Sequence, residues 1–101
     1  MNRMTLSTHI LDLAAGRPAA GVALLLLGPD GDSVGAGQTD QDGRFRFEGD
    51  FEPGDYTLRF ELEGITQLYA SLSLQARLHE ARHYHLPVLV SPFGVSTYRG
   101  T

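Results

Sequence analysis

The sequence predicts an all-β fold, an antiparallel β-sandwich of about eight short strands in two sheets. Apolar and polar residues alternate with a period of two in several segments. Turn-forming residues separate these segments about every ten residues, and no long stretch has helical periodicity. Short strands at such regular spacing are typical of sandwiches, because two half-buried sheets can cover each other's apolar faces.

The first half of the chain supplies three of the expected strands. Residues 6–13 form the first, with His9 and Leu11 on one face. The apolar run at residues 21–27 is long enough for a strand buried on both faces and too short for a helix. Residues 33–39 are rich in glycine and polar side chains, which indicates an edge strand.

The second half begins with the clearest hairpin signal, the dipeptide Asp42-Gly43, because glycine readily adopts the positive φ that hairpin turns need. A strand follows at residues 44–48, with Phe45 and Phe47 inward. Residues 64–69 are compatible with a short helical turn. The remaining strands are expected at residues 56–63, 71–78 and 83–90, and a last short strand follows a turn at residues 91–94 and runs to the C-terminus.

The composition indicates a globular domain and excludes several classes of function. The 101 residues are 42% hydrophobic and 20% charged, and we expect residues 1–101 to form one domain. A net charge of −4 without a basic cluster argues against nucleic-acid binding. The absence of cysteine excludes disulfides, thiol nucleophiles and cysteine-zinc sites. With no signal peptide visible and no apolar run long enough for a bilayer, we expect a cytoplasmic protein without membrane contact.

The strand at residues 83–90 has an unusual outward face. The period of two places His83, His85, Pro87 and Leu89 on it. This row is too apolar for a solvated surface and too polar for a core, so we expect a symmetric interface to cover it. A small sandwich fills its interior with side chains, so a substrate pocket must lie at an edge or between chains.

Three motifs in matching order resemble those of a known family. They are residues 8–12 (Thr-His-Ile-Leu-Asp), residues 42–44 (Asp-Gly-Arg) and the tail from His83 to Thr101, which ends in Tyr-Arg-Gly-Thr. Together they resemble 5-hydroxyisourate hydrolase, the purine-catabolic branch of the transthyretin-like proteins. The resemblance covers essentially the whole chain. The tail is its most specific part, because that branch typically ends in Tyr-Arg-Gly-Ser.

The resemblance implies both a fold and an activity. The fold is a transthyretin-like sandwich, assembled as a homotetramer with sites between dimers. The activity is hydrolysis of 5-hydroxyisourate to 2-oxo-4-hydroxy-4-carboxy-5-ureidoimidazoline in urate catabolism, with no cofactor and no metal. The catalytic residues carried over by position are His9, Arg44 and His85. The implied substrate-binding residues of the tail are Tyr98, Arg99 and Thr101.

The chain departs from the family pattern at three places. Thr101 replaces the usual final serine but keeps a hydroxyl, and Val95 stands where an aromatic residue is common. The segment between Tyr56 and His83 is short, so we expect the small helix of the family to be reduced or absent.

Opening a cyclic amide requires a nucleophilic water, stabilisation of the oxyanion and a proton for the leaving nitrogen. Histidine suits the first and third tasks, because its pKa of about 6.5 lies near working pH. We hypothesise that His9 and His85 position and deprotonate water. Arg44 would keep them neutral, bind the flat anionic ring and oppose the oxyanion's charge. Further donors for the ring's edge are Ser96, Tyr98 and Thr101.

Other interpretations of the same residues remain open. The fold could carry a small aromatic ligand without chemistry, or serve as a structural module. His83 and His85 lie on one face, as two ligands of a zinc site would, with His9 as the available third ligand. Taken singly, His83 is expected at the rim of the site, and His79 is expected to be a surface residue without function.

Overall fold

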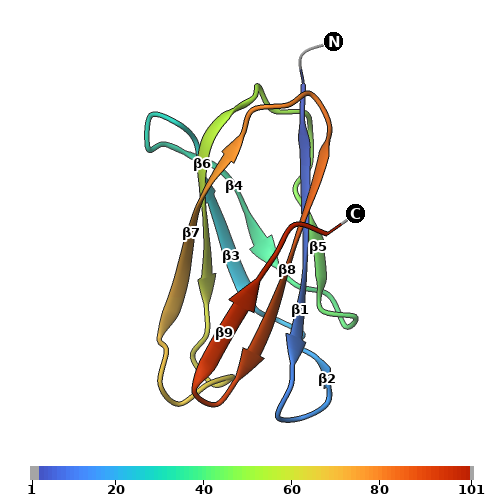
Figure 1. Cartoon of the computed structure of the whole chain (residues 1–101), viewed down its shortest axis with the longest axis vertical. Coiled ribbons are helices and arrows are strands. Elements are labelled where there is room, and N and C mark those ends of the chain that lie inside the picture. The colour runs from blue at the N-terminus through green and yellow to red at the C-terminus, as the bar shows by residue number, and fades with distance from the viewer. Residues whose placement is uncertain (1–2, 101) are drawn as a thin grey trace.

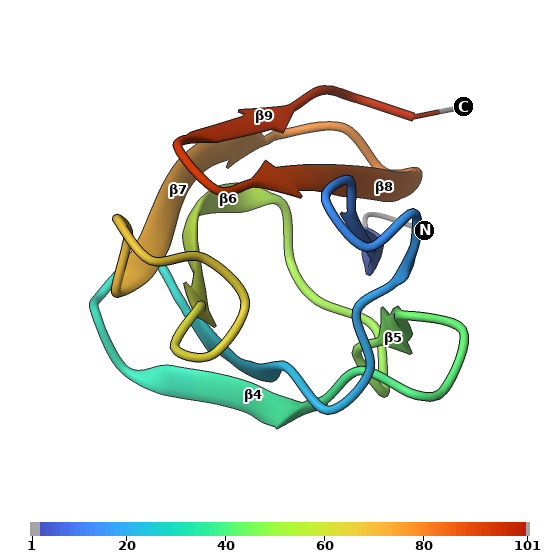
Figure 2. The same cartoon turned by 90° about the horizontal axis from the view of Figure 1, so that it is seen from below.

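The computed structural model describes residues 3–100. Within this range the chain forms strands only, and they build two sheets that face each other across one core (Figures 1 and 2). Their bounds are β1 (Thr5–Asp12), β2 (Arg17–Pro18), β3 (Ala23–Leu27), β4 (Ser33–Gln38), β5 (Arg44–Arg46), β6 (Gly54–Glu61), β7 (Ser71–Leu78), β8 (His83–Ser91) and β9 (Gly94–Thr97). The predicted all-β sandwich is confirmed.

The two sheets differ in how their strands pair. One has the order β4-β3-β6-β7 and is antiparallel throughout. The other has the order β2-β1-β8-β9, with β5 also paired to β1. In this second sheet β1 and β8 run parallel, whereas the other pairs of described strands are antiparallel, as expected of the predicted sandwich. No tight turn can join parallel neighbours, and here the intervening chain passes through the other sheet before it returns.

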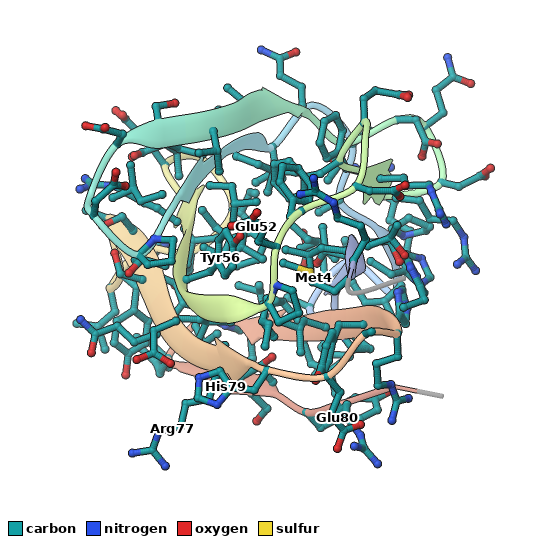
Figure 3. All side chains as sticks on the ribbon, turned by 90° about the horizontal axis from the view of Figure 1, so that it is seen from above. Met4, Glu52, Tyr56, Arg77, His79 and Glu80 are labelled. Atoms are coloured by element: carbon teal, nitrogen blue, oxygen red, sulfur yellow. The ribbon has the colours of Figure 1, made fainter. Side chains whose placement is uncertain are left out.

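The alternation read from the sequence matches the observed core. The residues expected inward on β6 and just beyond it are buried, as are those of β8 apart from half-buried Leu86. Met4 and Tyr56 lie between the sheets, whereas Arg77, His79 and Glu80 lie on the outside (Figure 3). The prediction for β3 is wrong in one respect, because only one of its faces is fully buried within the protomer. Its other face belongs to the outer surface of the four-stranded sheet.

The Asp42-Gly43 turn forms, but it does not make a hairpin. It joins β4 to β5, and these strands belong to different sheets, because β4 pairs with β3 and β5 pairs with β1. Gly43 has φ of 73°, as the turn prediction required. A Cβ at this position would lie 2.5 Å from the carbonyl oxygen of Ile10, so the close approach to β1 also requires glycine.

The connection between β6 and β7 contains turns and no helix, which confirms the expected reduction. The Thr66 hydroxyl in this connection donates to the Pro92 carbonyl, at 2.8 Å, and so ties it to the β8–β9 turn. Among residues 3–100 there is no helix that is long and apolar enough to cross a membrane.

The last strand ends earlier than predicted. β9 stops at Thr97, paired with Val88, and only an isolated bridge between Gly100 and His85 continues the ladder. The interruption lies beside Pro87, which has no N–H to donate. The Pro87 carbonyl instead accepts from the Thr97 hydroxyl at 2.8 Å. The residues after β9 run alongside β8 in both Figure 1 and Figure 2.

The packing of β4 on the core yields a stability prediction. A Cβ added at Gly35 would lie 2.8 Å from Cδ1 of Phe47, whose side chain is buried and cannot move away easily. Gly35→Ala should therefore lower the free energy of unfolding by about 1–3 kcal/mol through overpacking. Urea unfolding measures the change. Ala36→Ser, at the exposed neighbouring position, is the control, and equal stability of the two variants would contradict this packing.

Candidate active site

Three strands bring the predicted catalytic residues onto the outer face of the second sheet. In the register of β1 and β5, His9 lies opposite Arg44. In the register of β1 and β8, His85 lies opposite Ser7, two residues before His9. Residues paired across neighbouring strands point to the same face. His9, Arg44 and His85 therefore gather on one surface, although they come from distant parts of the chain.

The loop before β5 places Arg44 at this surface. The Asp40 carboxylate accepts hydrogen bonds from the backbone N–H groups of Asp42 and Arg44, both at 2.9 Å. The Ile10 N–H donates to the Gly43 carbonyl at 2.8 Å and so joins the loop to β1. A short polar side chain that closes its own loop is a common turn device. Here it fixes the start of β5, and with it the position of Arg44 beside His9.

A shallow hollow of about 240 Å³ lies at this place. Arg44 and His85 both line it. The other lining residues are Ser7, Thr8, Asp40, Phe45 and Arg46.

His9, which lies opposite Arg44 but does not line the hollow, has an unsatisfied nitrogen. Its Nε2 is buried and has no hydrogen-bond partner among the residues that the structure describes. A buried polar atom without a partner costs about 1–3 kcal/mol, so native proteins seldom retain one without a reason.

Ser7 links the two imidazoles of β8. Its Oγ lies 2.8 Å from Nε2 of His83 and 2.8 Å from Nδ1 of His85. Thr5 Oγ1 lies 2.6 Å from the remaining ring nitrogen of His83. The sequence analysis missed both hydroxyl residues. The period of two along this strand could have predicted them, because it places Thr5, Ser7 and His9 on one face.

The surroundings of His85 favour its neutral form. Burial lowers the pKa of His85 below its usual range, and the charge of Arg44 lowers this pKa further, as do the nearby imidazoles of His83 and His9. The pKa of His83 is also lowered, first by burial and then by Arg46 and Arg82. A neutral imidazole near neutral pH can accept a proton, as a general base must.

The described C-terminal residues that were predicted to bind the substrate do not line the hollow. Ser96 pairs with Leu89 in β9 and does not line the hollow. Tyr98 and Arg99 are exposed beyond β9. Gly100 reaches the site, because its N–H donates to the His85 carbonyl at 2.7 Å. Thr101, the last predicted substrate-binding residue, lies outside the described residues.

Two other features of the described residues bear on the alternatives. No group of three or more metal-ligating side chains is found among residues 3–100, and the two imidazoles of the zinc alternative bond to Ser7 instead. A larger hollow of about 720 Å³ lies on the other sheet, near Tyr56 and Arg77. It holds none of the predicted site residues. His79, bonded to Asp55 at 2.6 Å, is exposed on that side, as expected for a surface residue.

The lowered pKa values predict how stability depends on pH. Below about pH 6.5 and down to the lowered values, the unfolded chain binds more protons at His83 and His85 than the folded chain does. The free energy of unfolding should therefore fall as the pH falls through this window. Urea unfolding at several pH values should show a smaller slope for the double variant His83→Asn/His85→Asn. An unchanged slope would contradict the stated surroundings of the two rings.

Comparison with known proteins agrees with the fold and the motifs. The model of the HIUase/Transthyretin family matches residues 6–100. A 5-hydroxyisourate hydrolase of Mesorhizobium japonicum is 38% identical, over 95% of this chain and 91% of its own. The Klebsiella pneumoniae 5-hydroxyisourate hydrolase structure superposes with a TM-score of 0.86 at 34% identity, covering 96% of this chain and 99% of that one. Sea bream transthyretin in complex with thyroxine gives 0.85 at 29% identity, over 95% and 94%. The chain belongs to the HIUase/transthyretin family.

Proposed function

We propose that this chain hydrolyses 5-hydroxyisourate in urate catabolism, at the site formed by His9, Arg44 and His85. Relatives that bear this activity in their names match it over nearly the full length of both chains. The observation that carries the assignment of the site is the convergence of these three residues on one surface, where Arg44 and His85 line a hollow. The product is 2-oxo-4-hydroxy-4-carboxy-5-ureidoimidazoline.

The proposed reaction is the addition of water to a cyclic amide. A neutral His85 takes a proton from water, whose oxygen attacks the ring carbonyl and forms a tetrahedral oxyanion. The C–N bond then breaks, the carbonyl carbon becomes a carboxylate, and the leaving nitrogen takes up a proton from an imidazolium. His9, opposite Arg44 in the register of β1 and β5, is the second histidine of the proposed site. The division of these proton transfers between the two histidines is part of the proposal.

Arg44 has two tasks in this scheme. Its guanidinium presents a planar set of donors, which suits a flat anionic ring rich in carbonyl groups. Its positive charge also opposes the negative charge that develops on the attacked carbonyl. The same charge lowers the pKa of His85, so one residue both orients the substrate and keeps the base neutral.

A carrier function is the alternative, and the similarity to sea bream transthyretin with thyroxine favours it at the level of the fold. Binding alone does not require an imidazole whose pKa is lowered beside a guanidinium. A structural module likewise gains nothing from an unpartnered buried nitrogen at His9. Neither alternative explains why a neutral imidazole, a guanidinium and an unpartnered ring nitrogen lie close together.

The assembly and location belong to the same proposal. We propose that residues 1–101 form one domain and that four chains associate, with sites where dimers meet. Leu11 and Leu89 form a half-buried apolar row on the outer face of β1 and β8, next to Pro87, which is already buried within the protomer. A second protomer there would cover the hollow and bring its own β9 and tail close. A cytoplasmic location fits the cysteine-free composition.

The catalytic assignment predicts the effects of two substitutions. His85→Asn removes the base and Arg44→Lys removes the planar donors, so each should lower kcat/KM about 100-fold or more. The decay of freshly generated 5-hydroxyisourate, followed by ultraviolet absorbance with and without protein, measures this. His79→Asn, a surface change on the far sheet, is the control and should retain activity. Turnover of His85→Asn within a few-fold of the unsubstituted protein would exclude His85 as the base.

The proposed interface predicts a second result. Leu89→Arg places a charge in the apolar row and should convert tetramers to smaller species, with loss of activity as the sites lose their second wall. Sedimentation velocity measures the assembly. Leu25→Arg makes the same change on the outer face of the other sheet and serves as the control. An unchanged assembly of Leu89→Arg would place the interface elsewhere.

A further inference from the structure

A row of hydrogen-bonded side chains extends from the proposed base along β1 and β8. We call it the hydroxyl–imidazole row, and its members are Thr5, His83, Ser7 and His85. Thr5 Oγ1 lies 2.6 Å from Nδ1 of His83, while Ser7 Oγ lies 2.8 Å from Nε2 of His83 and 2.8 Å from Nδ1 of His85. The parallel register builds this row, since Thr5 pairs with His83 and Ser7 with His85.

The number of protons limits the row to two arrangements. A hydroxyl has one proton, and a neutral imidazole has one N–H. Ser7 must therefore donate to one ring and accept from the other. In the first arrangement Ser7 donates to Nδ1 of His85, whose own proton is then on Nε2. In the second, Nδ1–H of His85 donates to Ser7, Ser7 donates to Nε2 of His83, and Nδ1–H of His83 donates to Thr5 Oγ1.

Only the second arrangement leaves His85 able to act as a base towards the hollow. Its Nδ1 is bonded to Ser7, so Nε2 is the nitrogen that remains for water or substrate. A proton on Nε2 would block that lone pair. The tautomer of an imidazole is set by the hydrogen bond at its other nitrogen, and here that bond is made by Ser7.

We propose that Ser7 is a positioning residue, which His83 holds as an acceptor so that His85 keeps its proton on Nδ1 and a bare Nε2. This inference rests on the proposed function, because the hydrolysis supplies the need for a base. Neither Ser7 nor His83 touches the reacting atoms in this scheme. Their effect on the reaction passes through the ring of His85.

The charges around His83 permit the second arrangement, which a protonated His83 would exclude. A protonated His83 would donate from both nitrogens, so Ser7 would have to donate to His85 and impose the first arrangement. Arg46 on β5 and Arg82 before β8 lower the pKa of His83, as does its burial. On the other side of the row, burial lowers the pKa of His85, and Arg44 and His9 lower this pKa further. Both rings are therefore held neutral near neutral pH.

The test reads the proton on His85 directly. Long-range ¹H–¹⁵N correlation spectra of the substrate-free full chain report which ring nitrogen is protonated. We expect Nδ1–H for His85 in the unsubstituted protein and Nε2–H in Ser7→Ala. His83→Ala removes the acceptor for Ser7 and should shift the tautomer in the same direction.

Kinetics of 5-hydroxyisourate hydrolysis provide the second readout. Ser7→Ala should lower kcat roughly 10- to 100-fold and leave KM within about twofold, because Arg44 still binds the ring while the base is lost. Ser7→Thr restores the hydroxyl and should restore both kcat and the tautomer. Ser73→Ala, an exposed serine of β7, is the matched control and should change neither.

Two results would overturn the inference. One is a proton on Nε2 of His85 in the unsubstituted protein, and the other is a Ser7→Ala variant whose kcat stays within about twofold. A chain that does not hydrolyse 5-hydroxyisourate would instead contradict the proposed function. The spectrum is recorded without substrate, so it decides the place of the proton independently of that outcome.

Discussion

The parallel pairing of β1 with β8 is the constraint on which the rest of the molecule depends. It joins the first and the last long strand of the chain along the whole length of β1. The inward residues of both strands close the core, while their outward residues form one mixed surface of hydroxyls, imidazoles and apolar side chains. A register shift of one residue would turn every one of these side chains to the opposite face. The register therefore determines both the packing and the site.

The second element of the site, Arg44, depends on this pairing only indirectly. The loop that precedes it crosses from one sheet to the other and is fastened by Asp40 and by the close approach of Gly43 to β1. The antiparallel contact of β5 then sets Arg44 opposite His9. A guanidinium held at a fixed place by backbone hydrogen bonds needs little reorganisation during a reaction, which is the property that electrostatic stabilisation requires. The rigid sheet therefore holds the Arg44 guanidinium where the proposed reaction needs its charge.

Much of this could be predicted from the sequence, and the failures have a common cause. Strict alternation predicted the inward faces of β6 and β8, and the motifs drew attention to His9, Arg44 and His85, which the fold brings to one surface. Alternation reports which face a residue occupies but not which strand lies beside it. The parallel β1–β8 pair and the β4–β5 connection between sheets were therefore missed. Alternation along β1 could have placed Ser7 on the face of His9, but its bonds to two rings follow only from the register.

The central claim is that His9, Arg44 and His85 form one site that receives the substrate ring. A crystal structure of the protein with an unreactive planar analogue of 5-hydroxyisourate tests this most directly. We expect the ring in the hollow beside Arg44, within hydrogen-bond distance of its guanidinium and of Nε2 of His85, with its edge towards His9. An analogue bound instead in the larger hollow near Tyr56 and Arg77, or touching only one of the three residues, would contradict it.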